Sequence, residues 1–329
     1  MKMKSVILCN NPEKAAQVYS PERRATLAKI ADLHPEIITR DRFQEHADVL
    51  AEAEAVFSTW GFWPFSPEEF AAMPKLKHVF YAAGATDGFV RPFLERNVAV
   101  YSAWKANAIP VAEYCTAQIL LGCKGFFRNS RNLKSPAGFI RTNCGPGIYG
   151  ETVALIGAGA IAQKIQELLK AFHLNVLVIP SHPEKRTVSI EEAFQRAFVV
   201  SNHLPNRTDN RKVLTEKHFR SMREGAVFIN TGRGAQVDED ALARVMAQRP
   251  DLTAILDVTD PEPPEAGSPL YRLDNVLLSA HIAGSLNDEV LRMADIMIEE
   301  YQRIQAGEAP LFRVSEEMLI TSSKPAAAV

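Results

Sequence analysis

Short apolar stretches alternate with helical patterns along the whole chain of 329 residues. In the first third, the apolar stretches are rich in β-branched and aromatic residues, which is typical of strands. Segments with helical periodicity separate them, and one begins with Ser66 and Glu69 at the spacing of a capping box. This alternation predicts an α/β protein with mostly parallel sheets. The expected strands are SVILC, EIITR, AVFSTW, LKHVFYAA and VAVYSA.

The middle third repeats the pattern with six further strand candidates, VALIG, VLVIP, FVVSN, AVFIN, TAILDV and VLLSA. Six parallel strands match a complete double mononucleotide-binding unit. A long helix is expected before them, from Pro110 to about Lys134, followed by a Gly- and Pro-rich loop over 135–151. After them, 285–307 predicts a final amphipathic helix, and the small, polar tail 322–329 is expected to be disordered.

The nucleotide unit therefore lies in the middle of the chain and needs a second domain built from both ends. We expect two Rossmann-like domains. A doubly wound parallel-sheet nucleotide domain, 105–285, is inserted into a discontinuous substrate domain, 1–104 plus 286–329. Ligands usually bind in the cleft between two such domains.

Composition narrows the class of partner. The net charge of −2 is no sign of nucleic-acid or anionic-membrane binding, and no stretch approaches the ~20 apolar residues of a membrane span. The cysteines show no metal-ligand spacing and lie among apolar neighbours, so we expect no metal site and buried free thiols in a reducing compartment. A cytoplasmic protein is therefore predicted. The cysteines are Cys9, Cys115, Cys123 and Cys144.

A glycine pattern follows the first strand of the central unit and opens a helix. The first glycine permits a tight turn, the second lets backbone approach a pyrophosphate, and the third small residue lets helix and strand pack closely. A plain turn is the alternative, but the strand and helix context favours dinucleotide binding. The predicted phosphate loop contains Gly157, Gly159, Ala160, Ile161 and Ala162.

The end of the second central strand lacks the carboxylate that usually accepts hydrogen bonds from a ribose. Pro180 stands there. Ser181 and His182 can hydrogen-bond a 2′-phosphate, and Lys185 and Arg186 can neutralise it. This favours NADP over NAD as the cofactor, with solvated loop residues as the alternative reading.

Polar residues also occur at the ends of later central strands. Arg233 follows AVFIN, Asp257 closes TAILDV with Glu262 after it, and His281 ends LLSAH. A guanidinium suits a carboxylate, and a histidine held by a carboxylate can pass a proton near neutral pH. A surface arginine, a loop glutamate, a core histidine and a capping aspartate are the blander alternatives.

The ordered motifs in this chain resemble the D-isomer-specific 2-hydroxyacid dehydrogenase family. They are NAIPVAEYCTAQILL, the glycine loop, SNHLPNRTDNRKVL, MREGAVFINTGRGAQVDEDAL, LDVTDPEP and NVLLSAHIAGS. The resemblance implies a flavodoxin-like substrate domain around the nucleotide domain. It also implies hydride transfer between NAD(P) and C2 of a small 2-oxo or 2-hydroxy acid, and a homodimer formed through the nucleotide domain.

The resemblance assigns roles to individual residues. Arg233 would hold the carboxylate and carbonyl of the substrate, and His281 would donate or remove the proton. Glu262 would hydrogen-bond His281 and keep it basic, and Asp257 would orient the nicotinamide. Backbone N–H groups near Ala83 and Gly84 would bind the substrate carboxylate. The cofactor crevice would further include His203, Leu204, Pro205, Thr231, Gly232 and Gly284.

The chain departs from the family pattern in two further places and leaves the substrate open. Ala280 stands where the family often has a proline before the histidine. Formate-oxidising relatives typically carry glutamine where this chain has Glu262, which argues against formate. Trp60, Trp63 and Trp104 could border the cleft and suit a bulkier acid than glyoxylate or hydroxypyruvate. Packing within the outer domain is the favoured reading of these aromatic residues.

Other functions remain possible on the same fold. Corepressors related to C-terminal-binding proteins use it as a cofactor-sensing interaction module and can keep the Arg, Glu and His. An enzyme for a related compound such as a sugar acid is a third possibility.

Overall fold

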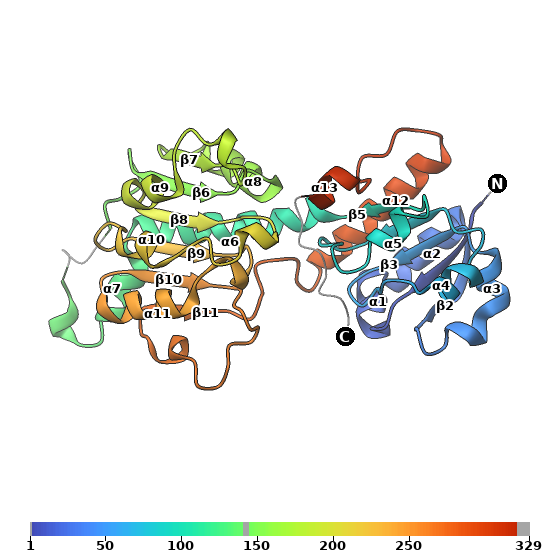
Figure 1. Cartoon of the computed structure of the whole chain (residues 1–329), viewed down its shortest axis with the longest axis horizontal. Coiled ribbons are helices and arrows are strands. Elements are labelled where there is room, and N and C mark those ends of the chain that lie inside the picture. Colours follow the sequence, from blue (N-terminus) through green and yellow to red (C-terminus); the bar gives the residue numbers. More distant parts are fainter. Residues whose placement is uncertain (1, 141–144, 321–329) are drawn as a thin grey trace. The chain divides into compact units, whose positions relative to one another are not determined.

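The protein, described by a computed structural model over residues 2–140 and 145–320, contains two parallel sheets (Figure 1). One sheet has five strands in the order β2-β1-β3-β4-β5, and the other has six in the order β11-β10-β9-β8-β6-β7. Residues up to Asn107 and those from Ser285 onward form one compact unit, and Ala108–Gly284 form the other. The predicted α/β fold, with a central unit inserted into a discontinuous one, is confirmed.

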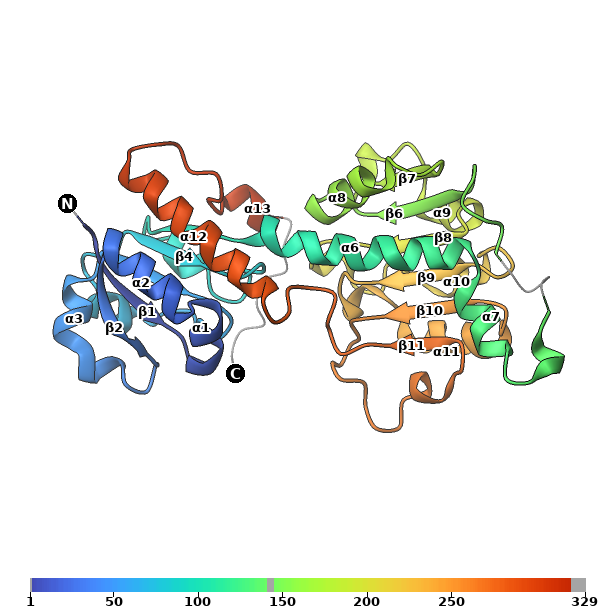
Figure 2. The same ribbon diagram turned by 180° about the vertical axis from the view of Figure 1, so that it is seen from behind.

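The first unit holds the five-stranded sheet, and helices from both parts of the chain pack against it. The late helix α12 contacts α1 and α2, so residues far apart in sequence share one face of the sheet (Figure 2). The strands are β1 (Lys4–Leu8), β2 (Asp32–Ile38), β3 (Ala55–Ser58), β4 (His78–Tyr81) and β5 (Ala99–Ser102). The helices are α1 (Pro12–Val18), α2 (Pro21–Ile30), η1 (Phe43–His46), α3 (Ala47–Glu52), α4 (Pro67–Ala72), α5 (Arg91–Leu94), α12 (Glu289–Gln305) and α13 (Glu316–Ile320).

Strands β1, β3, β4 and β5 are buried on both faces, and neighbouring residues on a strand point to opposite faces. Val6 and Leu8 of β1 belong to the core beneath Trp63, whereas Ile7 belongs to the core beneath α12. Helices therefore cover both faces of the sheet.

Strand β2 begins four residues before the expected EIITR segment. Pro35 lies inside it, although a proline cannot donate a hydrogen bond to a neighbouring strand. The structure tolerates this proline because β2 is an edge strand, and its pairing with β1 shifts register between Ser5 and Ile7.

The second unit holds the six-stranded sheet, with every pair of neighbouring strands parallel. Its strands are β6 (Thr152–Ile156), β7 (Asn175–Ile179), β8 (Val199–Asn202), β9 (Val227–Asn230), β10 (Thr253–Leu256) and β11 (Val276–Leu278). Its helices are α6 (Trp104–Cys123, which begins in the first unit), α7 (Phe126–Asn132), η2 (Pro136–Gly138), α8 (Ala160–Leu169), η3 (Pro183–Lys185), α9 (Ile190–Arg196), η4 (Thr208–Asn210), α10 (Glu216–Arg220), η5 (Gly234–Gln236), α11 (Glu239–Gln248) and η6 (Pro269–Arg272).

The single helix expected from Pro110 to about Lys134 is two helices, so that prediction is wrong in its start and in its continuity. Helix α6 starts at Trp104 and carries Pro110 in its interior. It ends before Gly125, whose φ of 69° is the left-handed conformation that favours glycine. Figure 2 shows α6 lying along the sheet. A Cβ at Gly122 would meet Val199 of β8 at 3.1 Å, so this face of α6 lies close to the strands.

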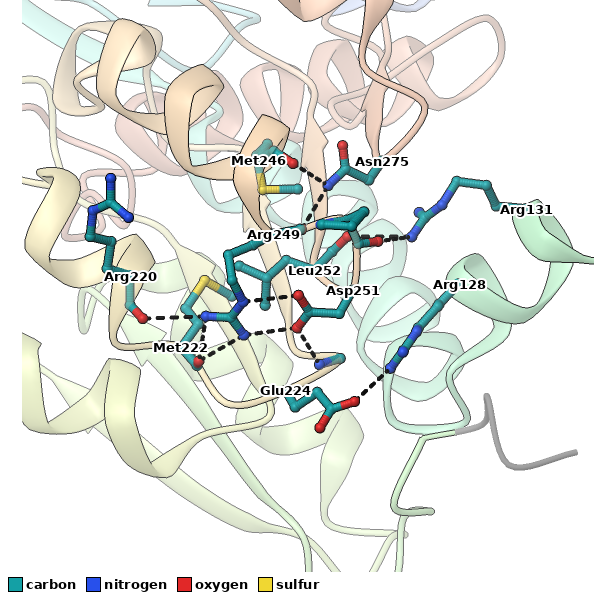
Figure 3. Close-up of polar contacts among 12 residues, drawn as sticks. Arg128, Arg131, Arg220, Met222, Glu224, Met246, Arg249, Asp251, Leu252 and Asn275 are labelled. Carbon is teal, nitrogen blue, oxygen red and sulfur yellow. Dashed lines mark hydrogen bonds and ion pairs between the residues drawn. The ribbon is translucent and has the colours of Figure 1, made fainter. Parts of the chain in front are cut away.

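Polar contacts fasten α7 and the turn before β10 at the amino ends of the central strands (Figure 3). Arg249 forms a two-pronged ion pair with Asp251, at 2.9 Å to Oδ1 and 2.8 Å to Oδ2. Asp251 also accepts the N–H of Gly225 at 3.1 Å. Arg131 of α7 donates to the carbonyl of Pro250 at 2.8 Å. These contacts hold the sheet at the edge opposite the carboxyl ends of its strands.

Cys9, Cys115 and Cys123 are buried free thiols, as predicted. Cys144, part of the expected 135–151 loop and the tail at 322–329 lie outside the described residues. The helix expected over 285–307 runs from Glu289 to Gln305, and a further short helix, α13, follows it. Within the described ranges, no helix combines the length and apolarity needed to cross a membrane.

Candidate active site

The carboxyl edge of the six-stranded sheet collects the predicted site residues of the central unit. All six strands are parallel, so the loops that follow them meet along one edge. Strand β6 lies between β7 and β8, and the chain leaves β6 towards β7 on one side before returning to β8 on the other. Such a reversal opens a crevice at the strand ends, where ligands bind in this class of fold.

The glycine loop between β6 and α8 has the geometry that a pyrophosphate requires. Gly157 has a φ of 117°, and a Cβ there would lie 2.5 Å from the carbonyl oxygen of His203. Gly159 is the N-cap of α8, and a Cβ there would meet nothing within 4 Å. Ala162 is fully buried against the sheet. Gly157 thus permits the tight turn, Gly159 leaves space for a pyrophosphate to approach the backbone, and Ala162 lets the helix pack closely on the sheet.

The first turn of α8 faces this open space without a side-chain cap. The N–H groups of Ala160 and Ile161 come first in the helix, where backbone donors have no partner inside the helix and the dipole favours an anion. The residues present therefore fit a dinucleotide, with its pyrophosphate held by the start of α8.

The loop after β7 places Pro180, Ser181 and His182 next to the glycine loop, since the N–H of Gly157 donates to Ile179 at 2.7 Å. Arg186 donates to the carbonyls of Pro180 and Ser181 at 2.8 and 2.7 Å. Its guanidinium therefore fixes the shape of this loop, a role that the sequence did not reveal.

Three buried side-chain amides join the loops after β8 and β9, and sequence analysis missed all of them. The amide nitrogen of Asn202 donates to Asn230 at 2.9 Å and to Gln236 at 2.7 Å. Gln236 in turn donates to the carbonyls of Leu204 and Pro205 at 2.8 and 2.9 Å. Asparagine and glutamine are common in loops, so no signal in the sequence marks them. This amide network sets the path of both cofactor loops.

Position 232 requires a glycine because the side chains of the amide network lie directly against it. A Cβ there would lie 2.7 Å from Oε1 of Gln236 and 2.8 Å from Nδ2 of Asn202. The N–H of Gly232 also donates to Asn230 at 3.2 Å.

Two titratable side chains in the floor of the crevice, His203 and Cys115, are held in their neutral forms. Nδ1 of His203 lies 3.3 Å from the hydroxyl of Thr231, which lies 3.3 Å from the thiol of Cys115 on α6. Burial lowers the pKa of His203 to about 3 and raises the pKa of Cys115 to about 12. Neither group is therefore charged near neutral pH. Nε2 of His203 is buried and has no hydrogen-bond partner among the described residues, which leaves it for a bound group.

Arg233 stands at the start of η5, directly after β9. Its backbone N–H donates to Gln236 at 3.1 Å, and its Nη1 donates to the carbonyl of Gly232 at 2.7 Å. The amide network thus holds the backbone of this arginine. The guanidinium is partly exposed and keeps further N–H groups for an anion.

Asp257 is buried at the end of β10, and both its carboxylate oxygens accept hydrogen bonds from the loop after β11. Oδ1 accepts the hydroxyl of Ser279 at 2.6 Å and the N–H of Ile282 at 2.8 Å, and Oδ2 accepts the N–H of Ala283 at 2.9 Å. Its backbone carbonyl accepts the N–H of His281 at 3.0 Å. The structure therefore ties Asp257 to the segment that carries His281.

His281 and Glu262 form a pair at the rim of this edge. Nδ1 of His281 lies 2.7 Å from Oε1 of Glu262, and the two side chains are 50% and 42% exposed. When Nδ1 carries the proton of this bond, Nε2 is the ring nitrogen left to exchange a proton with another group. His281 has a φ of 53°, a conformation that the Asp257 bonds hold in place.

The loop that carries Glu262 is anchored below it. A Cβ at Gly234 would lie 1.9 Å from the carbonyl carbon of Thr259, so this loop passes directly over the glycine. The N–H of Asp260 donates to Oε1 of Glu239 at 2.8 Å. Burial, with the nearby Asp260 and Asp240 carboxylates, raises the pKa of Glu239 to about 7, against the Asp260 N–H and Lys212.

The remaining predicted residues lie elsewhere. Gly284 follows Ala283 at the end of the central unit. Ala83 and Gly84 follow β4 in the first unit, and the N–H of Ala83 already donates to the carbonyl of Tyr81 at 2.9 Å. The hydroxyl of Ser102 donates to the carbonyls of Ala83 and Gly84, both at 2.8 Å.

The aromatic residues of the first unit mainly build its core. Trp63 and Phe65 are 4% and 5% exposed, and Nε1 of Trp63 donates to Glu69 at 3.0 Å. Trp60 is partly buried against the same core. Nε1 of Trp104 is buried, with no partner within the described part of the chain.

A family model for the D-isomer specific 2-hydroxyacid dehydrogenase, NAD binding domain, matches residues 117–283. The chain belongs to this family. It is 26% identical over 269 residues to the glyoxylate reductase of Korarchaeum cryptofilum, covering 78% of this chain and 81% of that protein. The fold resembles that of D-mandelate dehydrogenase from Rhodotorula graminis, with a TM-score of 0.77 at 20% identity, covering 94% of this chain and 97% of that one.

Another family relative is longer. D-3-phosphoglycerate dehydrogenase of Archaeoglobus fulgidus is 26% identical over 249 residues, which cover 73% of this chain and 47% of that protein. The chain thus spans about half the length of this relative.

Replacement of Gly234 by alanine is expected to destabilise the protein, because the new methyl group would overlap the backbone of Thr259. Overpacking of this kind typically costs about 1–3 kcal/mol, and a backbone clash belongs at the upper end. Urea unfolding measures the effect. Gly267→Ala is the matched control, since a Cβ at Gly267 would meet nothing within 4 Å. Equal stability of the two variants would contradict the close passage of the loop.

Glu239→Gln tests the buried carboxyl. The folded state raises this pKa from 4.5 to about 7 and so binds the proton more tightly than the unfolded chain. The wild type therefore loses the contribution of Glu239 as the pH rises through that interval, whereas a glutamine does not titrate. We expect the melting temperature of the variant, relative to wild type, to be higher at about pH 8 than at about pH 5. Glu265→Gln is the control, because Glu265 is a second carboxylate that lines the same surface pocket as Glu239. A pH-independent difference would count against the raised pKa.

Proposed function

We propose that the protein is an NAD(P)-dependent oxidoreductase that transfers a hydride between nicotinamide and C2 of a small 2-oxo or 2-hydroxy acid. The observation that carries this proposal is the hydrogen-bonded pair of His281 and Glu262 on loops beside Arg233, at the cofactor edge of a dinucleotide-binding sheet. Bound nicotinamide supplies or accepts the hydride, and the side chains position the acid and move the proton.

His281 acts as the proton donor during reduction and as the acceptor during oxidation. Glu262 holds Nδ1, so Nε2 exchanges the proton with the substrate oxygen. Glu262 also stabilises the imidazolium that forms when His281 accepts a proton. Asp257 acts by positioning, since its bonds to Ile282 and Ala283 fix the loop.

Arg233 binds the carboxylate of the substrate and stabilises the negative charge that grows on the carbonyl oxygen during reduction. A guanidinium suits both tasks because its N–H groups point in one plane as a fork. The bond from Nη1 to Gly232 fixes the orientation of that plane before substrate arrives. Such preorganised charge is usually a large contributor to catalysis.

Glyoxylate and hydroxypyruvate are the first substrates to test, and the glyoxylate reductase relative supports that choice. NADP is the proposed cofactor in preference to NAD. Pro180 offers no carboxylate to a ribose hydroxyl, while Ser181 and His182 are half-exposed at the same strand end.

Turnover of NADPH or NADH with glyoxylate, hydroxypyruvate and phenylpyruvate tests the activity, and His281→Ala tests the role of the histidine. General acid catalysis by a positioned histidine is typically worth about 10²–10⁴-fold, so we expect a loss of that size in kcat. Binding of the cofactor, followed by nicotinamide fluorescence, should not change. His173→Ala is the matched control, because His173 lies before β7 at the opposite edge of the sheet.

Near-normal turnover of His281→Ala would disprove the proton-transfer role. Tight cofactor binding by the wild type without turnover of any acceptor would favour a different substrate or a cofactor-sensing interaction protein.

We also propose that the protein forms a homodimer through the central unit and acts in the cytoplasm. Phe126 and Phe139, at and after the start of α7, are 50% and 68% exposed, as expected of an apolar surface that a second subunit covers. The buried free thiols support the proposed cytoplasmic location, because that compartment is reducing.

Light scattering tests the homodimer and should give twice the chain mass of 36.4 kDa. A mass of one chain at micromolar concentration would disprove the dimer.

A further inference from the structure

Arg207 is a basic residue of the cofactor edge to which neither the sequence motifs nor the proposed chemistry gives a role. It lies between β8 and η4, and its side chain is only 14% exposed. Nη1 of Arg207 lies 3.4 Å from Nε2 of His182, which follows β7. Strand β6 separates β8 from β7 in the sheet. Arg207 therefore bridges the loops on either side of the strand that leads into the glycine loop.

The loop that Arg207 reaches is already basic and fixed in shape. Arg186 is held by the carbonyls of Pro180 and Ser181. Burial lowers the pKa of Arg186, and the positive charge of Arg207 lowers it further, against the opposing effect of Glu184. The charge of Arg207 therefore acts on Arg186, and a phosphate bound between the two loops would be attracted by both guanidinium groups.

A carboxylate of the same segment holds Arg207 in the free protein. Nε of Arg207 donates to Oδ1 of Asp209 at 2.7 Å, and Nη2 pairs with Oδ2. Hydrogen bonding to Asp209 raises the pKa of Arg207, so the guanidinium stays charged. Asp209 is 58% exposed, so its carboxylate can move into water when another anion takes its place on the guanidinium. The second nearby carboxylate, Glu184, is 67% exposed and lies 3.5 Å from Nδ1 of His182.

We propose that Arg207, together with Ser181 and His182, binds the 2′-phosphate on the adenosine ribose of the cofactor, and that Asp209 competes with this phosphate for the guanidinium. The proposal rests on the dinucleotide binding proposed above. Arginine binds a phosphate through two parallel N–H bonds, the same geometry in which it now holds Asp209. In this proposal Arg207, which follows β8, discriminates between NADP and NAD. It takes the place of the carboxylate that is absent at Pro180, after β7.

The test is calorimetric binding of three fragments that contain no nicotinamide. Adenosine 2′,5′-bisphosphate carries the proposed phosphate, and adenosine 5′-monophosphate lacks it. Adenosine 3′,5′-bisphosphate carries the same charge on the neighbouring oxygen. Wild type should bind the 2′,5′-bisphosphate at least about tenfold more tightly than either of the others, as expected for charge-assisted hydrogen bonds.

Arg207→Gln should weaken binding of the 2′,5′-bisphosphate by about 10- to 100-fold and leave binding of the monophosphate unchanged. Arg211→Gln removes the same charge from the same segment, but its side chain pairs with Asp260 at 3.3 Å, so it should have no effect. Asp209→Asn should strengthen binding of the 2′,5′-bisphosphate several-fold, because the competing charge is gone. This last variant tests the proposal even if Arg207→Gln does not fold.

Equal affinity of wild type for the 2′,5′-bisphosphate and the monophosphate would overturn the inference, as would a preference that survives Arg207→Gln. Unchanged affinity in Asp209→Asn would overturn the competition by Asp209. In each of these cases NADH or NADPH would still bind, and the proposed function would stand. Failure of the wild type to bind either dinucleotide or the monophosphate would instead overturn the proposed function itself.

Discussion

The buried carboxylate of Asp257 is the interaction on which the arrangement of the active edge depends. A carboxylate without water needs donors for both oxygens, and the loop after β11 supplies all three that the structure shows. That loop can therefore take few other paths without leaving a buried charge unsatisfied. His281 lies between the bonded residues, and its backbone adopts a φ of 53°, which is uncommon for residues other than glycine. The packing of β10 and β11 thus fixes the backbone of His281, the proposed proton donor and acceptor, although its side chain is half-exposed.

Charge is distributed unevenly over this edge. The groups beneath the glycine loop are neutral, because burial holds His203 and Cys115 in their uncharged forms and the Asn202, Asn230 and Gln236 network consists of amides. The exposed charges lie at the rim, on Arg233 and on the pair of His281 and Glu262. A dinucleotide pyrophosphate would accordingly meet backbone donors at the start of α8. The charged groups at the rim suit the roles proposed for them, which are binding an anionic substrate and transferring a proton.

Local patterns in the sequence predicted the parts of this structure that local physics determines. The central strands could be predicted because short apolar runs bounded by turn residues are typical of buried strands. The glycine loop could be predicted because its tight turn needs a glycine, and Gly157 indeed has a positive φ that other residues rarely adopt. The approach of His281 to Glu262 was expected from the family resemblance, not from spacing, since 19 residues separate them. The helix boundaries failed where local rules conflict with packing. Pro110 resembles a helix start, yet α6 continues through it against β8 and β9.

The features that escaped prediction are those in which residues from different loops meet. Asn202, Asn230 and Gln236 are unremarkable one by one and become a framework only when β8 and β9 are neighbours. The same holds for Arg207, which lies 25 residues from His182 and reaches it across the end of β6. A strand-end carboxylate can be recognised from its spacing to a glycine loop, whereas a guanidinium arriving from a separate loop cannot. The missing acid at Pro180 was therefore visible in the sequence, but the residue best placed to take over cofactor discrimination became visible only in the fold.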